Sequence, residues 1–108
     1  DDLVKISGQW VYPLEVEQVI LSHPSVQDCA VVGVPDPKWG EAIKAVVELK
    51  PGAPVPPDEL IAMCRERLGP VKTPKSVDFV AALPRSAVGK VMRRAVRDTY
   101  WVGEARRV

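Results

Sequence analysis

The residues best suited to chemistry lie in the segment 83–94, LPRSAVGKVMRR. Lys90 directly follows Gly89 in a loop that we expect between a strand and a helix, and Arg93 and Arg94 come one helical turn later. A lysine carries its charge on a flexible four-carbon stem, so it can bring positive charge to a phosphate or carboxylate oxygen in another domain. The plainer interpretation, a solvated helix start, is the one that composition alone favours.

Signatures of an enzyme complete in itself are missing from the sequence. His23, the only histidine, stands beside Pro24 where a helix should end, and no serine or cysteine follows the pattern of a nucleophile in a tight turn. We therefore interpret His23 as a helix cap. The sequence has no Walker-type phosphate loop, dinucleotide fingerprint or cluster of metal ligands. Cys29 and Cys64 lie in an apolar and a helical segment, which favours neither a disulfide scaffold nor a zinc site and fits a reducing, cytoplasmic compartment.

Length and composition predict one small globular domain. The 108 residues (11.8 kDa) are 46% hydrophobic and 27% charged, well away from the composition of disordered chains. No apolar run reaches the roughly 20 residues of a membrane span and no targeting signal is visible, so we expect a soluble protein without a membrane partner. The chain opens without methionine in a segment typical of the middle of a protein, so we expect a fragment.

Positive charge is concentrated in the last quarter of the chain. The net charge is only +1, but residues 84–108 hold seven Lys or Arg against two acidic residues. This quarter should therefore prefer anions. The charge balance alone leaves open a phosphate-bearing small molecule, nucleic acid or an acidic partner protein.

The predicted elements mix helices and strands without strict strand–helix–strand repetition. Ser7 and Gly8 indicate the turn of a hairpin, Pro13 the first position of a helix, and Gly69 the end of another. In chain order we expect a hairpin over 5–12, a helix over 13–23, antiparallel strands over 26–34 and 42–49, a helix over 58–68, a strand over 76–83 and a basic helix over 91–100. The fold class is therefore α+β: a small mixed sheet of about three strands covered by helices and preceded by a two-stranded hairpin.

Five sequence blocks, in this order and spacing, carry a family resemblance: DDLVKISG, VYPLEVE, HPSVQDCAVVGVPDPKWGE, GPVKTPK and LPRSAVGKVMRR. Together they resemble the C-terminal domain of adenylate-forming (AMP-binding) acyl-CoA synthetases. The stretches GQWV and YWVG look most like benzoate-type and other aryl or cyclic carboxylate CoA ligases. The resemblance implies that a carboxylate and MgATP give an acyl-adenylate, from which CoA displaces AMP. The small domain then presents a different face to the large domain in each step.

Matched position by position, the resemblance assigns residues to both steps. Lys90 matches the adenylation lysine, which contacts the carboxylate and α-phosphate oxygens as the mixed anhydride forms. Gly8 matches a glycine that lets the pantetheine arm of CoA pass close to backbone, with Ser7 and Gln9 flanking that tunnel, although turn geometry alone would also explain the glycine. Lys5 falls where luciferase-like and some other members carry a lysine that works in the second step, and other members lack it.

The resemblance also places the start of the chain at the interdomain hinge. Asp1 matches the hinge residue, and Asp2 is the adjacent candidate. The chain, residues 1–108, would then be the mobile C-terminal domain. In that case we expect the large N-terminal domain, which would bind ATP with Mg²⁺ and the carboxylic acid, to lie outside residues 1–108. We therefore expect the isolated chain to be inactive.

Three further residues match positions that contact the CoA nucleotide. Trp39 matches an adenine-stacking position of related aryl-CoA ligases, and Lys75 matches a phosphate-contacting one. Arg65 aligns instead with a nucleotide-contacting arginine of acetyl-CoA synthetases, and Thr73 stands where some relatives have arginine. A loop aromatic that covers the sheet is an equal alternative for Trp39.

Other functions stay open at this stage. The segment from Pro84 to Lys90 resembles sites acetylated by bacterial protein acyltransferases, so a protein acetyltransferase is a further expected partner and acetylation of Lys90 a regulatory switch.

An adenylation domain of a peptide synthetase is the alternative within the superfamily. A basic module that binds nucleic acid or protein is the alternative outside it, and its binding should weaken steeply with salt. The carboxylic acid itself cannot be read from these residues.

Overall fold

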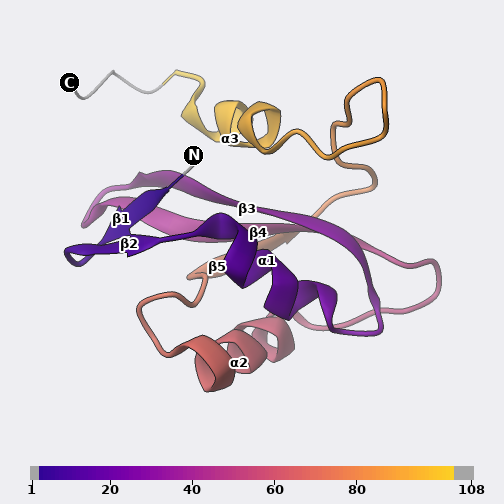
Figure 1. Cartoon of the computed structure of the whole chain (residues 1–108), viewed down its shortest axis with the longest axis horizontal. Helices are drawn as coiled ribbons and strands as arrows, with labels where there is room; N and C mark the ends of the chain where they lie inside the picture. Colours follow the sequence, from indigo (N-terminus) through magenta and orange to yellow (C-terminus); the bar gives the residue numbers. More distant parts are fainter. Residues whose placement is uncertain (1–2, 104–108) are drawn as a thin grey trace.

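The computed structural model describes residues 3–103, which form a hairpin, a three-stranded sheet and three helices (Figure 1). The elements are β1 (Val4–Ile6), β2 (Gln9–Val11), α1 (Pro13–Leu21), β3 (Val26–Asp36), β4 (Gly40–Leu49), α2 (Pro57–Leu68), β5 (Ser76–Phe79) and α3 (Arg93–Trp101). Their order and type confirm the predicted α+β fold. No helix in the described part of the chain is long and apolar enough to cross a membrane.

The main sheet has the order β3-β4-β5 and is mixed, as predicted. β3 and β4 pair antiparallel from Val26 opposite Leu49 to Asp36 opposite Gly40, whereas β5 runs parallel to β4. The predicted loop between β3 and β4 is too long. The Asp36 carboxylate accepts the N–H groups of Lys38 and Trp39 at 2.9 and 2.8 Å, which closes a short turn between the strands.

Two predicted boundaries are wrong in the last part of the chain. The strand expected over 76–83 ends at Phe79, because Val80 donates the last bond to Val47 and the chain then leaves the sheet edge. The N–H of Leu83 is accepted by the Glu48 carboxylate at 3.2 Å and not by a strand. The basic helix begins at Arg93 instead of residue 91, because Val91 forms an isolated bridge with Arg85.

The two faces of the sheet are covered by different elements. Side chains alternate along a strand, so Val31 and Val47 face α1, α2 and the hairpin, whereas Val32 and Val46 face α3. Figure 1 shows α3 on one side of the sheet and α1 with α2 on the other. The core is therefore divided in two, and the loop that carries Lys90 belongs to the α3 side.

The hairpin β1–β2 has the tight turn that its sequence predicts. Ser7 and Gly8 both adopt positive φ, 50° and 80°, which is the geometry of a two-residue turn that favours glycine. Val4 and Val11, which pair across the hairpin, are 3% and 1% exposed and join the core beneath α1. The turn itself is exposed, so the hairpin presents backbone to its surroundings from a fixed base.

Candidate functional site

Lys90 stands at the end of a closed loop. The N–H of Ser86 donates to the Lys90 carbonyl at 2.8 Å, and the N–H of Gly89 donates to the Ser86 carbonyl at 2.9 Å. Gly89 has a φ of 85°, a conformation that a side chain would strain. Lys90 is exposed, and its ammonium has no hydrogen-bond or ion-pair partner in residues 3–103. The loop therefore offers a positive charge on a fixed backbone.

Helix α3, which follows this loop, is fixed to the sheet by a buried carboxylate. Glu17 of α1, only 6% exposed, accepts bonds from Arg93 Nε at 2.8 Å and from a terminal Arg93 nitrogen at 2.7 Å. The same carboxylate accepts the N–H of Val31 on β3 at 2.8 Å. One buried side chain thus joins α1, β3 and the start of α3. This role could have been suspected from the sequence, because Glu17 is an acidic residue among the apolar positions that α1 buries.

The far end of α3 is held by a second polar contact. The Tyr100 hydroxyl donates to Asp78 of β5 at 2.6 Å, and the Lys44 ammonium donates to the same carboxylate at 3.0 Å. Burial raises the pKa of Asp78, but these two hydrogen bonds outweigh it and leave that pKa below its usual value. Burial, together with the bond to Asp78, raises the pKa of Tyr100 well above its usual range.

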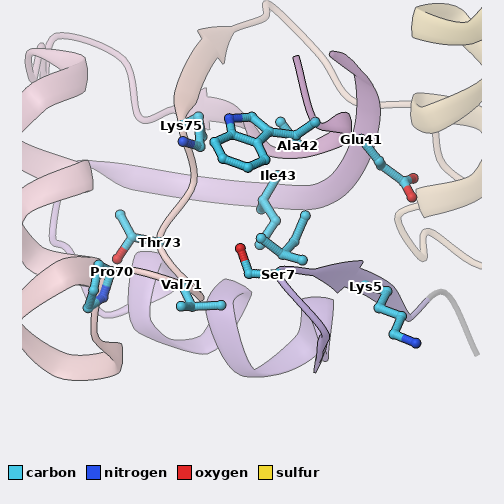
Figure 2. A pocket seen from close by; sticks show the side chains of 11 residues that line it. Lys5, Ser7, Glu41, Ala42, Ile43, Pro70, Val71, Thr73 and Lys75 are labelled. Carbon is cyan, nitrogen blue, oxygen red and sulfur yellow. The ribbon is translucent and has the colours of Figure 1, made fainter. Parts of the chain in front are cut away.

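A pocket of about 190 Å³ lies between the hairpin, the β3–β4 turn and the segment before β5 (Figure 2). Four of the sequence-predicted residues line it: Lys5, Ser7, Trp39 and Lys75. Figure 2 shows the Ser7 hydroxyl turned toward the centre of the lining residues, whereas Lys5 extends away from them. The pocket thus gathers residues that are up to 70 positions apart in the sequence.

The polar groups of this pocket suit an anionic ligand with an aromatic part. The Trp39 side chain is 58% exposed, and the ammonium groups of Lys38 and Lys75 lie 5.1 and 5.7 Å from the centre of its ring. A ring flanked by cations can stack a heterocycle while the lysines bind phosphate. The single acidic lining residue, Glu41, is drawn toward Arg97, 3.7 Å away.

The remaining predicted residues lie outside the pocket lining. Gly8 in the adjoining turn and Gln9 at the start of β2 are exposed, and no atom beyond the neighbouring residues lies within 4 Å of the position that a Gly8 Cβ would occupy. Lys5, although a lining residue, turns its ammonium away from the pocket to a position 5.4 Å from the Trp10 ring centre. Arg65 is exposed on α2 and is not brought to the pocket. Asp1 and Asp2, predicted as hinge residues, lie outside the described residues.

The Lys90 loop and the pocket lie at opposite ends of the sheet. Arg85 of the loop bonds Asp28 near the start of β3, whereas Trp39 lies in the turn that follows the end of β3 at Asp36. At about 3.3 Å per residue, β3 separates these ends by about 25 Å. Figure 1 shows the same arrangement, with the loop before α3 and the hairpin at opposite sides of the view.

Other reactive side chains have structural partners. Burial raises the pKa of the Cys64 thiol to about 11 and that of Cys29 well above its usual range, so both stay protonated and unreactive at neutral pH. His23 caps the end of α1 through its backbone, because its N–H donates to the Ile20 carbonyl at 3.0 Å, and its side chain makes further contacts. Its Nδ1 accepts the N–H of Ser25 and its Nε2 lies 2.6 Å from Glu59, so it joins the end of α1 to the start of α2. No metal-binding cluster occurs in residues 3–103.

Two basic residues of α3, Arg93 and Arg97, make contacts within the domain, whereas Arg94 is exposed. Arg93 binds Glu17, and Arg97 lies near Glu41 and over the Trp101 ring at 4.7 Å. A stripe of outward-facing cations, which binding to a nucleic-acid backbone requires, is thus weakened on this helix. Some of the arginines that made this helix look basic in the sequence therefore serve contacts within the domain.

Comparisons with known proteins agree with these features. A family model described as "AMP-binding enzyme C-terminal domain" matches residues 15–90. A feruloyl-CoA synthase from an Amycolatopsis species is 46% identical over 99 residues, which are 92% of this chain and 20% of that protein. A fatty acid–[acyl-carrier-protein] ligase from Streptomyces coeruleorubidus is 38% identical over 99% of this chain and 21% of its own length. The chain thus spans about a fifth of the length of these relatives.

The fold gives the same result. A solved acyl-CoA synthetase from Brucella canis superposes with a TM-score of 0.88 at 38% identity, over 97% of this chain and 20% of that structure. The family model covers most of the sequence and ends at Lys90, so the family assignment rests on the structural similarity and on a sequence match that includes the Lys90 loop. The chain belongs to the AMP-binding enzyme C-terminal domain family.

Proposed function

We propose that residues 1–108 are the mobile C-terminal domain of an AMP-forming carboxylate–CoA ligase, and that their partner is the enzyme's own N-terminal AMP-binding domain. In the first step a carboxylate oxygen attacks the α-phosphorus of ATP, giving an acyl-adenylate and pyrophosphate. In the second step the CoA thiol attacks the acyl carbon, giving a thioester, AMP and a proton. ATP with its Mg²⁺ and the carboxylic acid would bind mainly to the N-terminal domain.

One observation carries this proposal: the two candidate sites are about 25 Å apart along β3. A single reaction centre in the large domain cannot meet both ends of the sheet at once. The domain must therefore turn between the half-reactions, so that the Lys90 end serves adenylation and the hairpin end serves thioester formation. A hinge at Asp1, with Asp2 beside it, would permit that rotation.

Lys90 acts by charge in this proposal. As the carboxylate attacks, negative charge builds up on the oxygens of the α-phosphate, and a fixed ammonium nearby stabilises it. Because Lys90 is exposed and its ammonium lacks a partner within residues 3–103, no internal ion pair must break before it binds. The closed loop before it restricts the positions that the ammonium can reach.

The hairpin and the pocket would hold CoA. The open space beside Gly8 suits the narrow pantetheine arm, which Ser7 and Gln9 would flank, and the pocket next to it suits the nucleotide. Trp39 would stack the adenine and Lys75 would bind phosphate. Arg65 is not among the residues that line the pocket, so its predicted contact with the nucleotide lacks this support. Lys5 would act in thioester formation from the rim.

The test is a separation of the two half-reactions in the intact ligase that contains this chain. Lys90→Ala should abolish ATP–pyrophosphate exchange and leave the conversion of a supplied acyl-adenylate and CoA to thioester largely intact. Lys50→Ala, which removes another exposed lysine, is the control and should change neither rate. Loss of both half-reactions in Lys90→Ala, with folding unchanged, would show that the proposed division of labour is wrong.

We also propose Lys90 as an acetylation site for a protein acetyltransferase. Lys90 is exposed beside the tip of a loop, where an enzyme can reach it, and acetylation would remove the charge on which adenylation depends. Mass spectrometry of the ligase from acetyltransferase-active cells should find acetyl-Lys90, together with reduced ATP–pyrophosphate exchange. Only unmodified Lys90 in those cells would contradict this proposal.

A further inference from the structure

Arg85, five residues before Lys90, connects the lysine loop to two neighbouring strands. One terminal nitrogen of its guanidinium donates to Asp28 of β3 at 3.0 Å, and the other donates to Glu48 of β4 at 3.2 Å. Asp28 and Glu48 are register partners in the β3–β4 ladder. We name Asp28, Glu48 and Arg85 the loop clamp, because one side chain of the loop spans both strands.

The loop clamp also binds the backbone at both ends of the loop. The Arg85 nitrogen that meets Asp28 donates to the carbonyl of Gly89 at 3.3 Å, directly before Lys90. The Glu48 oxygen that meets Arg85 accepts the N–H of Leu83 at 3.2 Å. The clamp therefore fixes the point where the chain enters the loop and the peptide from which Lys90 projects.

Electrostatics couples the clamp to the loop. Two carboxylates directly opposite each other on paired strands repel, and a cation between them removes that repulsion. Arg85 can supply this cation only while the loop is docked on the sheet. Arg85 therefore neutralises Asp28 and Glu48 only when the loop that ends at Lys90 is docked on the sheet.

We propose that Asp28 and Glu48 are positioning residues for adenylation, acting through Arg85 and the Gly89 carbonyl to hold the backbone of Lys90. The proposal rests on the proposed function of Lys90. Their side chains are 28% and 19% exposed and that of Arg85 is 35% exposed, and ion pairs with this much exposure contribute little to stability. Their effect on the reaction is larger, because a misplacement of about 1 Å in a reacting group costs on the order of 100-fold in rate.

The test uses Asp28→Asn combined with Glu48→Gln in the intact ligase. ATP–pyrophosphate exchange should fall at least about tenfold, and on the order of 100-fold if Lys90 shifts by about 1 Å. Conversion of a supplied acyl-adenylate and CoA should stay within about twofold of the parent, because the hairpin end of the sheet is untouched. Glu15→Gln, which removes the half-buried Lys72–Glu15 pair (3.1 Å) on the other face, should leave both rates unchanged.

A second variant separates geometry from charge. Arg85→Lys keeps the positive charge but cannot span both strands and the Gly89 carbonyl, so exchange should fall although the charge is retained. Parent rates in Arg85→Lys, or in the double variant, would overturn the positioning role while Lys90→Ala still abolishes exchange. A proportional loss of both half-reactions would also overturn it, because that result indicates a structural role alone. If Lys90→Ala retains exchange, the proposed function of Lys90 fails first.

Discussion

Substitution of Gly8 by leucine tests whether the hairpin turn borders the path of CoA. Gly8 has a φ of 80°, so any side chain there brings its Cβ close to the following carbonyl. This strain costs about 1–2 kcal/mol of folding free energy. Apart from the neighbouring residues, no atom of residues 3–103 lies within 4 Å of the place that the new Cβ would take, so leucine meets no obstacle there. Any larger effect must come from a group outside residues 3–103.

The expected effect on the reaction follows from that open space. If the pantetheine arm fills it, an added side chain overpacks the tunnel at a cost of about 1–3 kcal/mol. This cost corresponds to a loss of about 5- to 150-fold in the rate of thioester formation from a supplied acyl-adenylate. ATP–pyrophosphate exchange should remain, because Lys90 lies at the other end of the sheet.

Gly52→Leu is the matched control for backbone strain. Gly52 has a φ of 70° in the turn after β4, and its Cβ position is also free of neighbours within 4 Å. Both variants should lower the Tm of the chain by a similar amount, about 4–8 °C per kcal/mol. If Gly8→Leu folds and forms thioester as fast as Gly52→Leu, CoA does not pass this turn.

Three further predictions follow from buried or exposed contacts. Glu17→Gln removes the buried charge that Arg93 binds and should lower the free energy of unfolding in urea by about 3 kcal/mol at pH 7. The pKa of Tyr100 is raised, so its neutral hydroxyl stabilises the fold at pH values below about 10, and this stabilisation is lost as the pH rises further. Tyr100→Phe should therefore make the Tm fall less steeply with pH on the alkaline side. Trp39→Ala should raise KM for CoA about tenfold and leave KM for free pantetheine unchanged, because only CoA carries adenine; equal shifts would contradict the stacking role.

Local signals in the sequence predicted most of the elements. The Ser7–Gly8 pair demanded a turn with positive φ, and Pro13 began a helix where its missing N–H costs nothing. Nearly continuous runs of apolar residues marked β3 and β4 as buried strands. These features depend on neighbours within a few positions, so they can be read without knowledge of the fold. The position of Lys90, directly after a loop glycine, can likewise be read from its sequence neighbours alone.

Boundaries that depend on distant partners were missed. β5 ends at Phe79 because the chain leaves the edge of β4, and Glu48, far away in sequence, accepts the N–H of Leu83. His23 caps its own helix through its backbone N–H, but its side chain also binds Ser25 and Glu59. A contact across the fold replaced the local strand bond in the first case and was added to the local cap in the second.

The sequence by itself determined most of the elements, the apolar surroundings of Cys29 and Cys64, and an exposed cation at position 90. Only the tertiary structure placed that cation and Trp39 at opposite ends of one sheet and set Asp28 beside Glu48. The reason is physical: the register of β3 against β4 is fixed by which residues reach the core faces, and that register determines the partners of every charged side chain along the strands.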